Sequence, residues 1–431
     1  MNRVIRRAIS VIQLLCFLCF FPAFAYAEEP VSVQDRKGTA PAQACWVDRE
    51  SYADGSAYEN PPTGVRFVRI GLRYGNTAVE EAEFENLSGN GFRIGSYDAE
   101  RNFVEKSRCT DALLRISWAA HPENGLMILG GEDEEILYLS RGEDCVAIEA
   151  LDGETAYRGN SYRGGFECRK QPEYRLSVIN CVGLEDYVKG VVPYEMANDW
   201  PMEALKAQAV CARTYVVFNQ NAYVEEGFDL TDNTESQVYR GTVWANERTD
   251  AAVNDTAGEL IRWRGEVCQI YYFAADGGAT EDGKNVFDAD LPYLRGKTDP
   301  FEQAVDYAYK SWTRSWDGDD ISERLAGKGY TLDTVMELTP EYSEMGNVIA
   351  ITFTDIRRAH IRLEGRACYT VLGLYDCRFT IRKDPNGFVF EGSGLGHSCG
   401  MSQWGARAMD ETYGFDYQDI LRFYYTGVYI V

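Results

Sequence analysis

Short segments in which hydrophobic and polar residues alternate fill the chain from residue 65 to about residue 153. Residues 66–72 and 126–129 are examples, and Gly, Asn and Asp separate one segment from the next. Alternation with a period of two, interrupted by turn-forming residues, is typical of strands joined by turns. We therefore expect residues 65–155 to form a β-rich domain. We assign it an accessory role because no group of residues with catalytic chemistry stands out in it.

The rest of the chain mixes two kinds of pattern. Three segments alternate like strands: 174–182, 348–354 and 379–382. Residues 157–166 read YRGNSYRGGF, which is typical of a turn-rich strand pair. Residues 184–189 resemble a short helix that ends at Gly190, and residues 401–409 also favour a helix. Because strands and helices do not alternate regularly, we expect an α+β fold of mixed antiparallel strands and helices over residues 156–431.

The strongest helical pattern covers residues 202–217, which are rich in Ala with Leu, Met, Lys and Gln. A buried stripe is expected from apolar residues at helical spacing: Met202, Leu205, Ala209, Ala212 and Val216. Pro201 suits the first helical position, and Asp199 can accept hydrogen bonds from the free amides of the first turn. Lys206 and Arg213 are seven residues apart, so the helix brings both cations to nearly the same face.

A single glutamate, Glu195, lies just before this helix in a predicted turn. Its neighbours in the sequence are apolar: Val191, Val192, Met196 and Trp200. Burial against apolar groups raises the pKa of a carboxyl, which can then stay protonated and act as a general acid. The alternative from the residues alone is that Glu195 only forms an ion pair with Lys206 or Arg213.

Composition and charge narrow the classes of function. The formal net charge is −24, which argues against a nucleic-acid binder and against attachment to an anionic membrane surface through basic patches. The only histidines in the sequence are His121, His360 and His397. A three-histidine zinc site would need all of them, so we do not expect a His-rich metalloenzyme.

The first 64 residues carry the features of an exported chain. Arg3, Arg6 and Arg7 precede an apolar stretch over residues 8–24, and Ala25-Tyr26-Ala27 resembles a cleavage site. We expect residues 1–27 to be a signal peptide, with an uncleaved membrane anchor as the alternative. Residues 28–64 are polar, contain several prolines and suggest a linker. The expected location is therefore extracytoplasmic, in the cell wall or at the outer face of the membrane.

Cysteines leave two possibilities open. Ten follow the predicted signal segment: Cys45, Cys109, Cys145, Cys168, Cys181, Cys211, Cys268, Cys368, Cys377 and Cys399. An even number in an exported protein permits disulfides, and buried free thiols are the alternative. No C-x-x-C pair occurs among these ten cysteines, so neither a zinc ribbon nor a thioredoxin-like motif is expected.

Several ordered sequence blocks resemble the stage II sporulation protein D (SpoIID/LytB) family. The blocks are EDYVKGVVPYEM at 185–196, WPMEALKAQAVCARTY at 200–215, SQVYRG at 236–241, GLGHSCGMSQWGA at 394–406 and DILRFYYTG at 419–427. They occur in the family's order and extend the resemblance over residues 156–431. A long ordered set of matches is more specific than any one motif.

The resemblance implies a lytic transglycosylase that cleaves MurNAc–GlcNAc bonds of peptide-stripped peptidoglycan strands and forms 1,6-anhydroMurNAc, in sporulation or cell-wall remodelling. It places the catalytic acid on Glu195. Substrate-binding positions carried over from the family are Lys206, Gln208, Arg213, Gln237, His397, Gln403 and Tyr425, with Tyr424 as the alternative to Tyr425. The implied partners are glycan strands, with a cell-wall amidase and other sporulation wall-remodelling proteins as further candidates, and no cofactor is implied.

Two segments depart from the family pattern. The Ser-Thr-Ser-Gly-Gly-like segment of relatives reads Ala274-Ala275-Asp276-Gly277-Gly278 here, and the Gly-Trp-Gly-His-Gly pattern reads GLGHS at 394–398. Some relatives hold zinc near the first segment through His and Cys. Because no His lies near it in this sequence and Cys268 is the nearest thiol, we expect no metal.

Other polar residues of the C-terminal half have structural alternatives to a functional role. Glu281 and Asp282 could supply a second carboxyl but are expected to lie in a solvated turn, and His397 taken alone could be structural. Ser398 and Ser402 lack a Gly-x-Ser-x-Gly elbow, so a serine hydrolase is not expected. Two rivals to the enzyme remain: a non-enzymatic glycan-binding enhancer of an N-acetylmuramoyl-L-alanine amidase, and a structural member of a wall-remodelling complex that docks through its β-rich domain.

Overall fold

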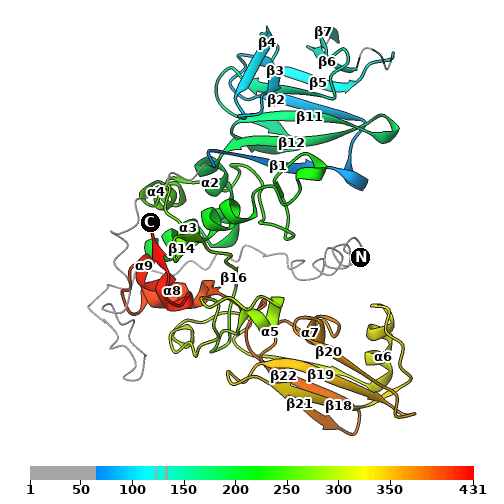
Figure 1. Cartoon of the computed structure of the whole chain (residues 1–431), viewed down its shortest axis with the longest axis vertical. Helices are drawn as coiled ribbons and strands as arrows, with labels where there is room; N and C mark the ends of the chain where they lie inside the picture. Colours follow the sequence, from blue (N-terminus) through cyan, green and yellow to red (C-terminus); the bar gives the residue numbers. More distant parts are fainter. Residues whose placement is uncertain (1–64, 122, 124, 132–133) are drawn as a thin grey trace, which may run out of the picture. The chain divides into compact units, whose positions relative to one another are not determined.

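A computed structural model describes residues 65–431 except residues 122, 124, 132 and 133 (Figure 1). The predicted signal segment and linker therefore lie outside the described residues. The chain divides into two compact units. Of the described residues, the N-terminal unit contains 65–199 and 212–259, and the C-terminal unit contains 200–211 and 260–431.

Two sheets form most of the N-terminal unit. One has the strand order β13-β1-β12-β11-β8-β3-β4 and the other β10-β9-β2-β5-β6-β7. Their bounds are β1 Phe67–Arg73, β2 Glu81–Asn86, β3 Phe92–Tyr97, β4 Phe103–Cys109, β5 Leu113–Trp118, β6 Leu126–Gly130, β7 Glu135–Leu139, β8 Cys145–Ala150, β9 Thr155–Tyr157, β10 Asn160–Tyr162, β11 Gly165–Gln171, β12 Arg175–Gly183 and β13 Leu230–Thr231. Strand β2 buries every second residue, and its Phe84 ring lies 4.8 Å from that of Phe166 in β11. The sheets therefore share a core built from the period-two pattern.

The pairing of β12 carries the larger sheet across residue 155. Strand β12 pairs antiparallel with β1 on one side and with β11 on the other. Segments on both sides of the expected boundary at residue 155 thus belong to one sheet, and the compact unit continues to residue 199 before resuming at residue 212. Local alternation does not predict this pairing of β1 with β12, because the two strands are distant in the sequence.

Helix α2 (Leu184–Glu195) is longer than the sequence predicts. The expected end at Gly190 is wrong, since the helix continues through it. Gly190 instead allows the helix to pack closely against the segment with Tyr239 and Gly241. A Cβ there would lie 2.5 Å from the Tyr239 ring and 2.9 Å from the Gly241 carbonyl oxygen. Pro193 also lies inside the helix. The N-terminal unit also contains α4 (Glu247–Asp255) and the short 3-10 turns Gly75–Thr77, Pro172–Tyr174 and Val224–Glu226.

Helix α3 (Met202–Asn219) confirms the strongest helical pattern. Its first turn is satisfied differently from the prediction, since the amides of Glu203 and Ala204 donate to Oδ2 of Asp410 at 2.8 and 3.3 Å. Asp410 lies on α8, so this acceptor could not be read from nearby sequence. The buried residues exceed the expected stripe and include Ala204, Ala207, Gln208, Val210, Cys211, Arg213 and Thr214, whereas Met202 is only half-buried.

The C-terminal unit combines small sheets with short helices. Its strand orders are β15-β14-β24, β16-β23, β17-β22-β21 and β18-β19-β20. The strands are β14 Ile261–Trp263, β15 Glu266–Val267, β16 Tyr272–Phe273, β17 Trp312–Trp316, β18 Val335–Tyr342, β19 Val348–Asp355, β20 His360–Glu364, β21 Phe379–Asp384, β22 Gly387–Gly392, β23 Met401–Ser402 and β24 Tyr429–Ile430. The helical segments are α5 Gly283–Phe287, η6 Glu302–Ala304, α6 Gly318–Ala326, α7 Ala367–Thr370, α8 Gln403–Glu411 and α9 Tyr417–Tyr424.

Mixed helices and antiparallel strands confirm the α+β class. Strands β19 and β21 occur where alternation predicts them. Phe353 of β19 and Phe379 of β21 join a core with Trp312 and Ile321. Helix α8 begins at Gln403, after the short strand β23, rather than at residue 401. Among the described residues, no helix has both the length and the apolar content needed to cross a bilayer.

Cysteines in the described part of the chain are free thiols. They are Cys109, Cys145, Cys168, Cys181, Cys211, Cys268, Cys368, Cys377 and Cys399. All but Cys145 are buried, and Cys145 is half-buried. Of the two alternatives that the sequence leaves open, the structure therefore has free thiols at these nine positions, eight of them buried. Cys45 lies outside the described residues.

Candidate functional site

The proposed acid, Glu195, is the last residue of α2. Its side chain is half-buried, and Val191, Val192 and Met196 beside it in the sequence are buried. The prediction of a turn at Glu195 is wrong, since the helix continues through it and the amide of Met196 still donates to the Val192 carbonyl.

Gln237 joins α2 through a tyrosine. Its Oε1 accepts from the Tyr187 hydroxyl at 3.2 Å, and its Nε2 donates to the Ala212 carbonyl at 3.4 Å. Burial raises the pKa of Tyr187 well above its usual value, and the negative charge of Glu195 is among the smaller causes. The N-terminal unit thus brings Glu195, Tyr187 and Gln237 into one neighbourhood.

The Arg213 side chain forms an ion pair and hydrogen bonds within the protein. Its guanidinium donates through Nε and a terminal nitrogen to the two carboxylate oxygens of Glu185, at 2.8 and 2.6 Å. Further bonds of 3.3 Å reach the carbonyls of Val253 and Glu259. The side chain is 0% exposed. This arrangement favours a positioning role for Arg213 over the direct substrate contact that the resemblance implies.

Lys206, Gln208 and Gln403 belong to the C-terminal unit. Nζ of Lys206 lies 3.1 Å from Oε1 of Glu203, one helical turn away. The amide nitrogen of Gln403 donates to Oε1 of Gln208 at 3.3 Å. Nε2 of Gln208 is buried and has no hydrogen-bond partner. The structure therefore brings together the two glutamines that come from sequence blocks nearly 200 residues apart.

His397 is a neutral imidazole among aromatic rings. Its ring centroid lies 4.9 Å from that of Phe287, 5.2 Å from Phe273 and 6.1 Å from Tyr271. Nδ1 accepts from the Cys399 amide at 3.2 Å. Burial lowers the pKa of His397 to about 3, and the charge of Arg366 lowers it further. His397 can therefore accept or donate hydrogen bonds at neutral pH but does not offer a positive charge.

Tyr425 is a core residue. Its side chain is 0% exposed, and its hydroxyl donates to the Tyr271 carbonyl at 2.7 Å and lies 3.4 Å from the Cys211 sulfur. Tyr424, the alternative that the resemblance leaves open, is 1% exposed and donates to Oδ2 of Asp299 at 2.5 Å. Both hydroxyls are occupied within the protein, so a supporting role fits them better than stacking on a sugar.

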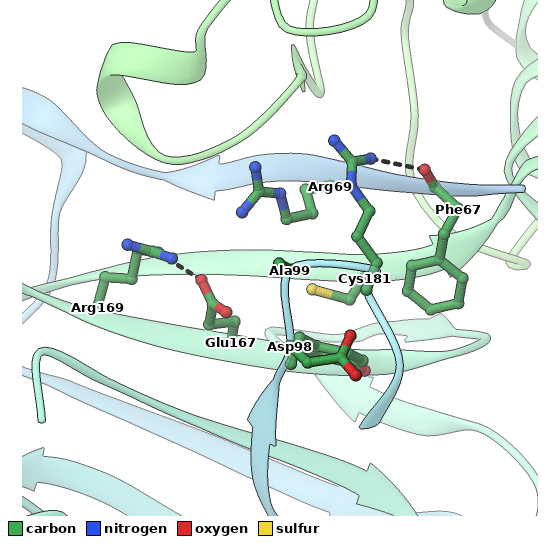
Figure 2. A pocket seen from close by; sticks show the side chains of 9 residues that line it. Phe67, Arg69, Asp98, Ala99, Glu167, Arg169 and Cys181 are labelled. Atoms are coloured by element: carbon green, nitrogen blue, oxygen red, sulfur yellow. Dashed lines mark hydrogen bonds and ion pairs between the residues drawn. The ribbon is translucent and has the colours of Figure 1, made fainter. Parts of the chain in front are cut away.

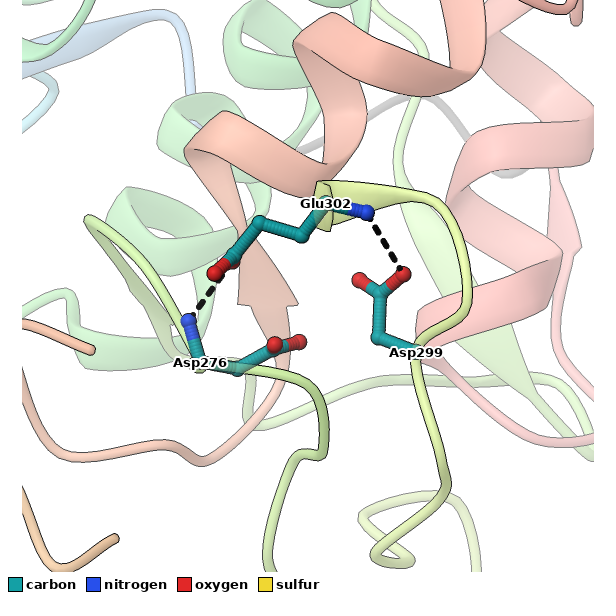
Figure 3. A group of neighbouring side chains, drawn as sticks. All are labelled: Asp276, Asp299 and Glu302. Carbon is teal, nitrogen blue, oxygen red and sulfur yellow. Dashed lines mark hydrogen bonds between the residues drawn. The ribbon is translucent and has the colours of Figure 1, made fainter. Parts of the chain in front are cut away.

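Sequence reasoning did not predict the burial of two acidic groups in the C-terminal unit. Glu281 is 3% exposed and accepts from Ser343 Oγ at 2.6 Å and from Asn347 Nδ2 at 3.1 Å. The expectation that it lies in a solvated turn is therefore wrong. The second group is Asp276 with Asp299 and Glu302, whose carboxylate oxygens lie within 4.8 Å of one another (Figure 3). Only Asp276 stood out in the sequence, as a departure from the family pattern.

A cavity of about 260 Å³ in the N-terminal unit holds none of the predicted site residues (Figure 2). Its lining residues are Phe67, Arg69, Tyr97, Asp98, Ala99, Arg101, Glu167, Arg169 and Cys181. Arg169 pairs with Glu167, and Arg101 pairs with Asp229 at 2.7 Å. Because acidic partners balance two of its arginines, the cavity is not an obvious anion site.

Comparison with known proteins matches the region that carries Glu195. The family model described as "Stage II sporulation protein" (SpoIID) matches residues 173–263. An uncharacterised protein of Brachyspira hyodysenteriae is 38% identical over 296 residues, which is 67% of this chain and 77% of that protein.

Two relatives from Bacillus subtilis carry functional names. One, named "Stage II sporulation protein D", is 29% identical over 276 residues, covering 60% of this chain and 78% of that protein. The other, named "Amidase enhancer", is 29% identical over 287 residues, covering 56% of this chain but only 39% of that protein. Together with the matched segment and the ordered sequence blocks, these similarities show that the chain belongs to the SpoIID family.

Proposed function

We propose that this protein is an exported lytic transglycosylase that cleaves MurNAc–GlcNAc bonds in peptide-stripped peptidoglycan strands. The observation that carries the proposal is Glu195, a half-buried carboxyl at the end of α2 inside the segment that matches the family model. Buried Val191, Val192 and Met196 adjoin it in the chain. Apolar neighbours and the negative end of a helix dipole both disfavour a charged carboxylate, as a general acid requires.

A single carboxyl is sufficient for this reaction. Most glycosidases need a second carboxyl as base or nucleophile. In the proposed reaction, Glu195 gives its proton to the bridging oxygen, and an oxocarbenium-like centre develops at the MurNAc anomeric carbon. The C6 hydroxyl of the same MurNAc then attacks that carbon and returns a proton to the Glu195 carboxylate, forming 1,6-anhydroMurNAc. An attacking group within the substrate supplies proximity without a bound water.

The other predicted site residues differ in the contacts that their side chains make, and we propose a separate role for each kind. Gln237 lies next to the acid through Tyr187, so it is proposed to support the acid. Lys206, whose Nζ lies 3.1 Å from Oε1 of Glu203, is proposed to contact the glycan. Gln208 and Gln403 form a paired amide group with one buried nitrogen still lacking an acceptor, which suits a sugar hydroxyl or N-acetyl oxygen. Arg213 is proposed to position α2 rather than to bind substrate.

The second candidate function is enhancement of a wall amidase without cleavage. The observation in its favour is the relative named "Amidase enhancer". Either function places the protein outside the cytoplasm, in contact with peptidoglycan and in a sporulation or wall-remodelling setting, to which the names of the Bacillus relatives point. A cell-wall amidase is the proposed protein partner in both cases.

Mass spectrometry of amidase-treated peptidoglycan, incubated with wild type, Glu195→Gln or Glu225→Gln, tests the proposal. Glu225 is exposed in the same unit and provides a matched control. We expect anhydro products from wild type and Glu225→Gln, and at least a roughly hundredfold lower yield from Glu195→Gln, since general acids contribute about 10²–10⁴ in rate.

The other outcomes separate the alternatives. Reducing-end products would mean hydrolysis and a second carboxyl. No cleavage by any of the three proteins, together with equal stimulation of an added amidase by wild type and Glu195→Gln, would replace the enzyme with the enhancer.

A further inference from the structure

Three buried carboxyls converge in the C-terminal unit (Figure 3). Asp276 follows β16, Asp299 precedes η6, and Glu302 is the first residue of η6. Their exposed fractions are 0%, 1% and 1%. One carboxylate oxygen from each lies within 4.8 Å of the others. We call these three residues the acidic triad.

Glu302 is oriented by four hydrogen-bond donors. Its Oε2 accepts from the Asp276 amide at 2.7 Å and from Ser402 Oγ at 2.6 Å. Its Oε1 accepts from the Gly277 amide at 2.8 Å and from the Tyr307 hydroxyl. Four donors on one carboxylate stabilise the charged form and fix its orientation.

Asp299 is also oriented by donors. Its Oδ1 accepts from the amides of Phe301 and Glu302 at 2.7 and 3.2 Å. Its Oδ2 accepts from the Tyr424 hydroxyl at 2.5 Å. The second lone pair of Oδ2 remains available for another positive or donating group.

Asp276 has one carboxylate oxygen without a hydrogen-bond partner. Its Oδ1 accepts from the Gly278 amide at 2.7 Å, whereas its Oδ2 is buried and has no hydrogen-bond partner. The side chain points toward Asp299 (Figure 3). A fully buried carboxylate oxygen without a partner is costly. The site therefore lacks one positive or donating group next to this atom.

No basic side chain supplies that group. Among the described residues, no Lys or Arg forms an ion pair with a member of the acidic triad. Burial raises the pKa of Asp276 well above its usual range and also raises that of Glu302, and the charge of Asp299 adds to both. Such mutual repulsion is relieved either by a bound cation or by bound protons.

We propose that Asp276, Asp299 and Glu302 bind one hard divalent cation of the Ca²⁺, Mg²⁺ or Mn²⁺ class, with Asp276 Oδ2 as a direct ligand. Carboxylate oxygens without thiol or imidazole select these ions over soft metals. The expectation of no metal rested on missing His and Cys near Asp276, which does not bear on an all-oxygen site. The ion would tie the segment after β16 to η6, and this role does not depend on glycan cleavage.

Metal content and thermal unfolding of the purified protein test the proposal. The variants are Asp276→Asn and the control Asp290→Asn, which removes the same charge from a carboxylate that is 64% exposed and pairs with Arg295. Each protein is treated with EDTA, dialysed, and measured with Ca²⁺, Mg²⁺ or Mn²⁺. We expect wild type and Asp290→Asn to bind about one equivalent of one of these ions and to gain several degrees in Tm.

Asp276→Asn is expected to lose both the bound ion and the Tm response. Two outcomes would overturn the proposal. In the first, wild type holds no stoichiometric metal and its Tm does not respond to any of the three ions, so that protons neutralise the triad; this measurement needs no variant to fold. In the second, Asp276→Asn binds the ion as wild type does, which removes Asp276 from the ligand set.

Discussion

Arg213 of α3 and Glu185 of α2 form a two-pronged ion pair, with nitrogen–oxygen distances of 2.8 and 2.6 Å. The arginine side chain is fully buried and that of Glu185 is 34% exposed. Parallel bonds of this kind fix orientation as well as distance. Because Glu195 closes the same helix α2, the pair anchors the element that carries the proposed acid.

Arg213→Met is expected to lower the free energy of unfolding by about 3 kcal/mol. The Glu185 carboxylate would stay partly buried but would lose its cationic partner. Urea unfolding measures the loss. Arg213→Met combined with Glu185→Met should cost less than the sum of the single changes, as expected for residues in contact. Unchanged stability of Arg213→Met, with weaker binding of peptide-stripped glycan, would return Arg213 to the substrate site.

Gly190→Ala tests whether close packing requires a glycine at this position of α2. A helix normally gains about 1 kcal/mol when Gly becomes Ala. Here the new Cβ would lie 2.5 Å from the Tyr239 ring and 2.9 Å from the Gly241 carbonyl oxygen, so we expect a net loss of about 1–3 kcal/mol from overpacking. Gly183→Ala is the matched control, since its nearest neighbour is 3.8 Å away. Equal unfolding midpoints for the two variants would contradict this explanation.

Local pattern predicts the elements that local forces decide. The Ala-rich sequence of α3 and the alternation in β12 and β19 are signals carried by neighbouring residues, and these elements form where they are expected. What the sequence does not predict depends on distant residues. Asp410 accepts a hydrogen bond from a first-turn amide of α3, a role expected of Asp199. The Tyr239 ring leaves no room for a side chain at Gly190.

The candidate site is also predicted only in part from the sequence, because some of its contacts depend on distant residues. The family blocks give Glu195, Gln208 and Gln403 as candidates, and the structure pairs the two glutamines. Residue type alone cannot show whether an arginine faces a ligand or a buried carboxylate. Arg213 therefore looks like a substrate residue in the sequence and is buried against Glu185 in the structure. Asp299 and Glu302 belong to no motif, and only folding brings them to Asp276.

Asp376 should make the protein less stable as pH rises from about 4 to about 7. Its Oδ1 accepts from Ser398 Oγ at 2.7 Å, while its Oδ2 is buried without a partner. Burial raises the pKa of Asp376 from 3.8 to about 7. The folded state therefore holds a proton that the unfolded state releases near pH 4, and this stabilisation is lost as pH rises from about 4 to about 7.

Asp376→Asn removes that dependence. At about 1.4 kcal/mol per pKa unit, the difference in unfolding free energy between wild type and Asp376→Asn should move by roughly 4 kcal/mol between pH 4 and 8, in favour of the variant at high pH. Urea unfolding at several pH values measures it. Parallel curves for the two proteins would show that Asp376 is ionised in the folded state throughout this range.

His397 should stay neutral far below the pH at which histidine usually gains a proton. Burial among Phe273, Phe287 and Tyr271 lowers the pKa of His397 from 6.5 to about 3, and its Nδ1 already accepts from the Cys399 amide. The unfolded state takes up a proton near pH 6.5 and the folded state does not. The stabilisation is therefore complete above pH 6.5 and is lost as pH falls toward 3.

Histidine NMR spectra, assigned with His397→Asn, provide the measurement. Asn can keep an acceptor for the Cys399 amide but does not titrate. We expect no change in the His397 ring signals between pH 8 and 5, and a stability advantage of wild type over His397→Asn that shrinks over the same range. A His397 signal that titrates near pH 6.5 would instead give the site an imidazolium able to attract the lactyl carboxylates of a peptide-stripped glycan. Glycan binding would then strengthen on acidification, whereas a neutral His397 makes no such contribution.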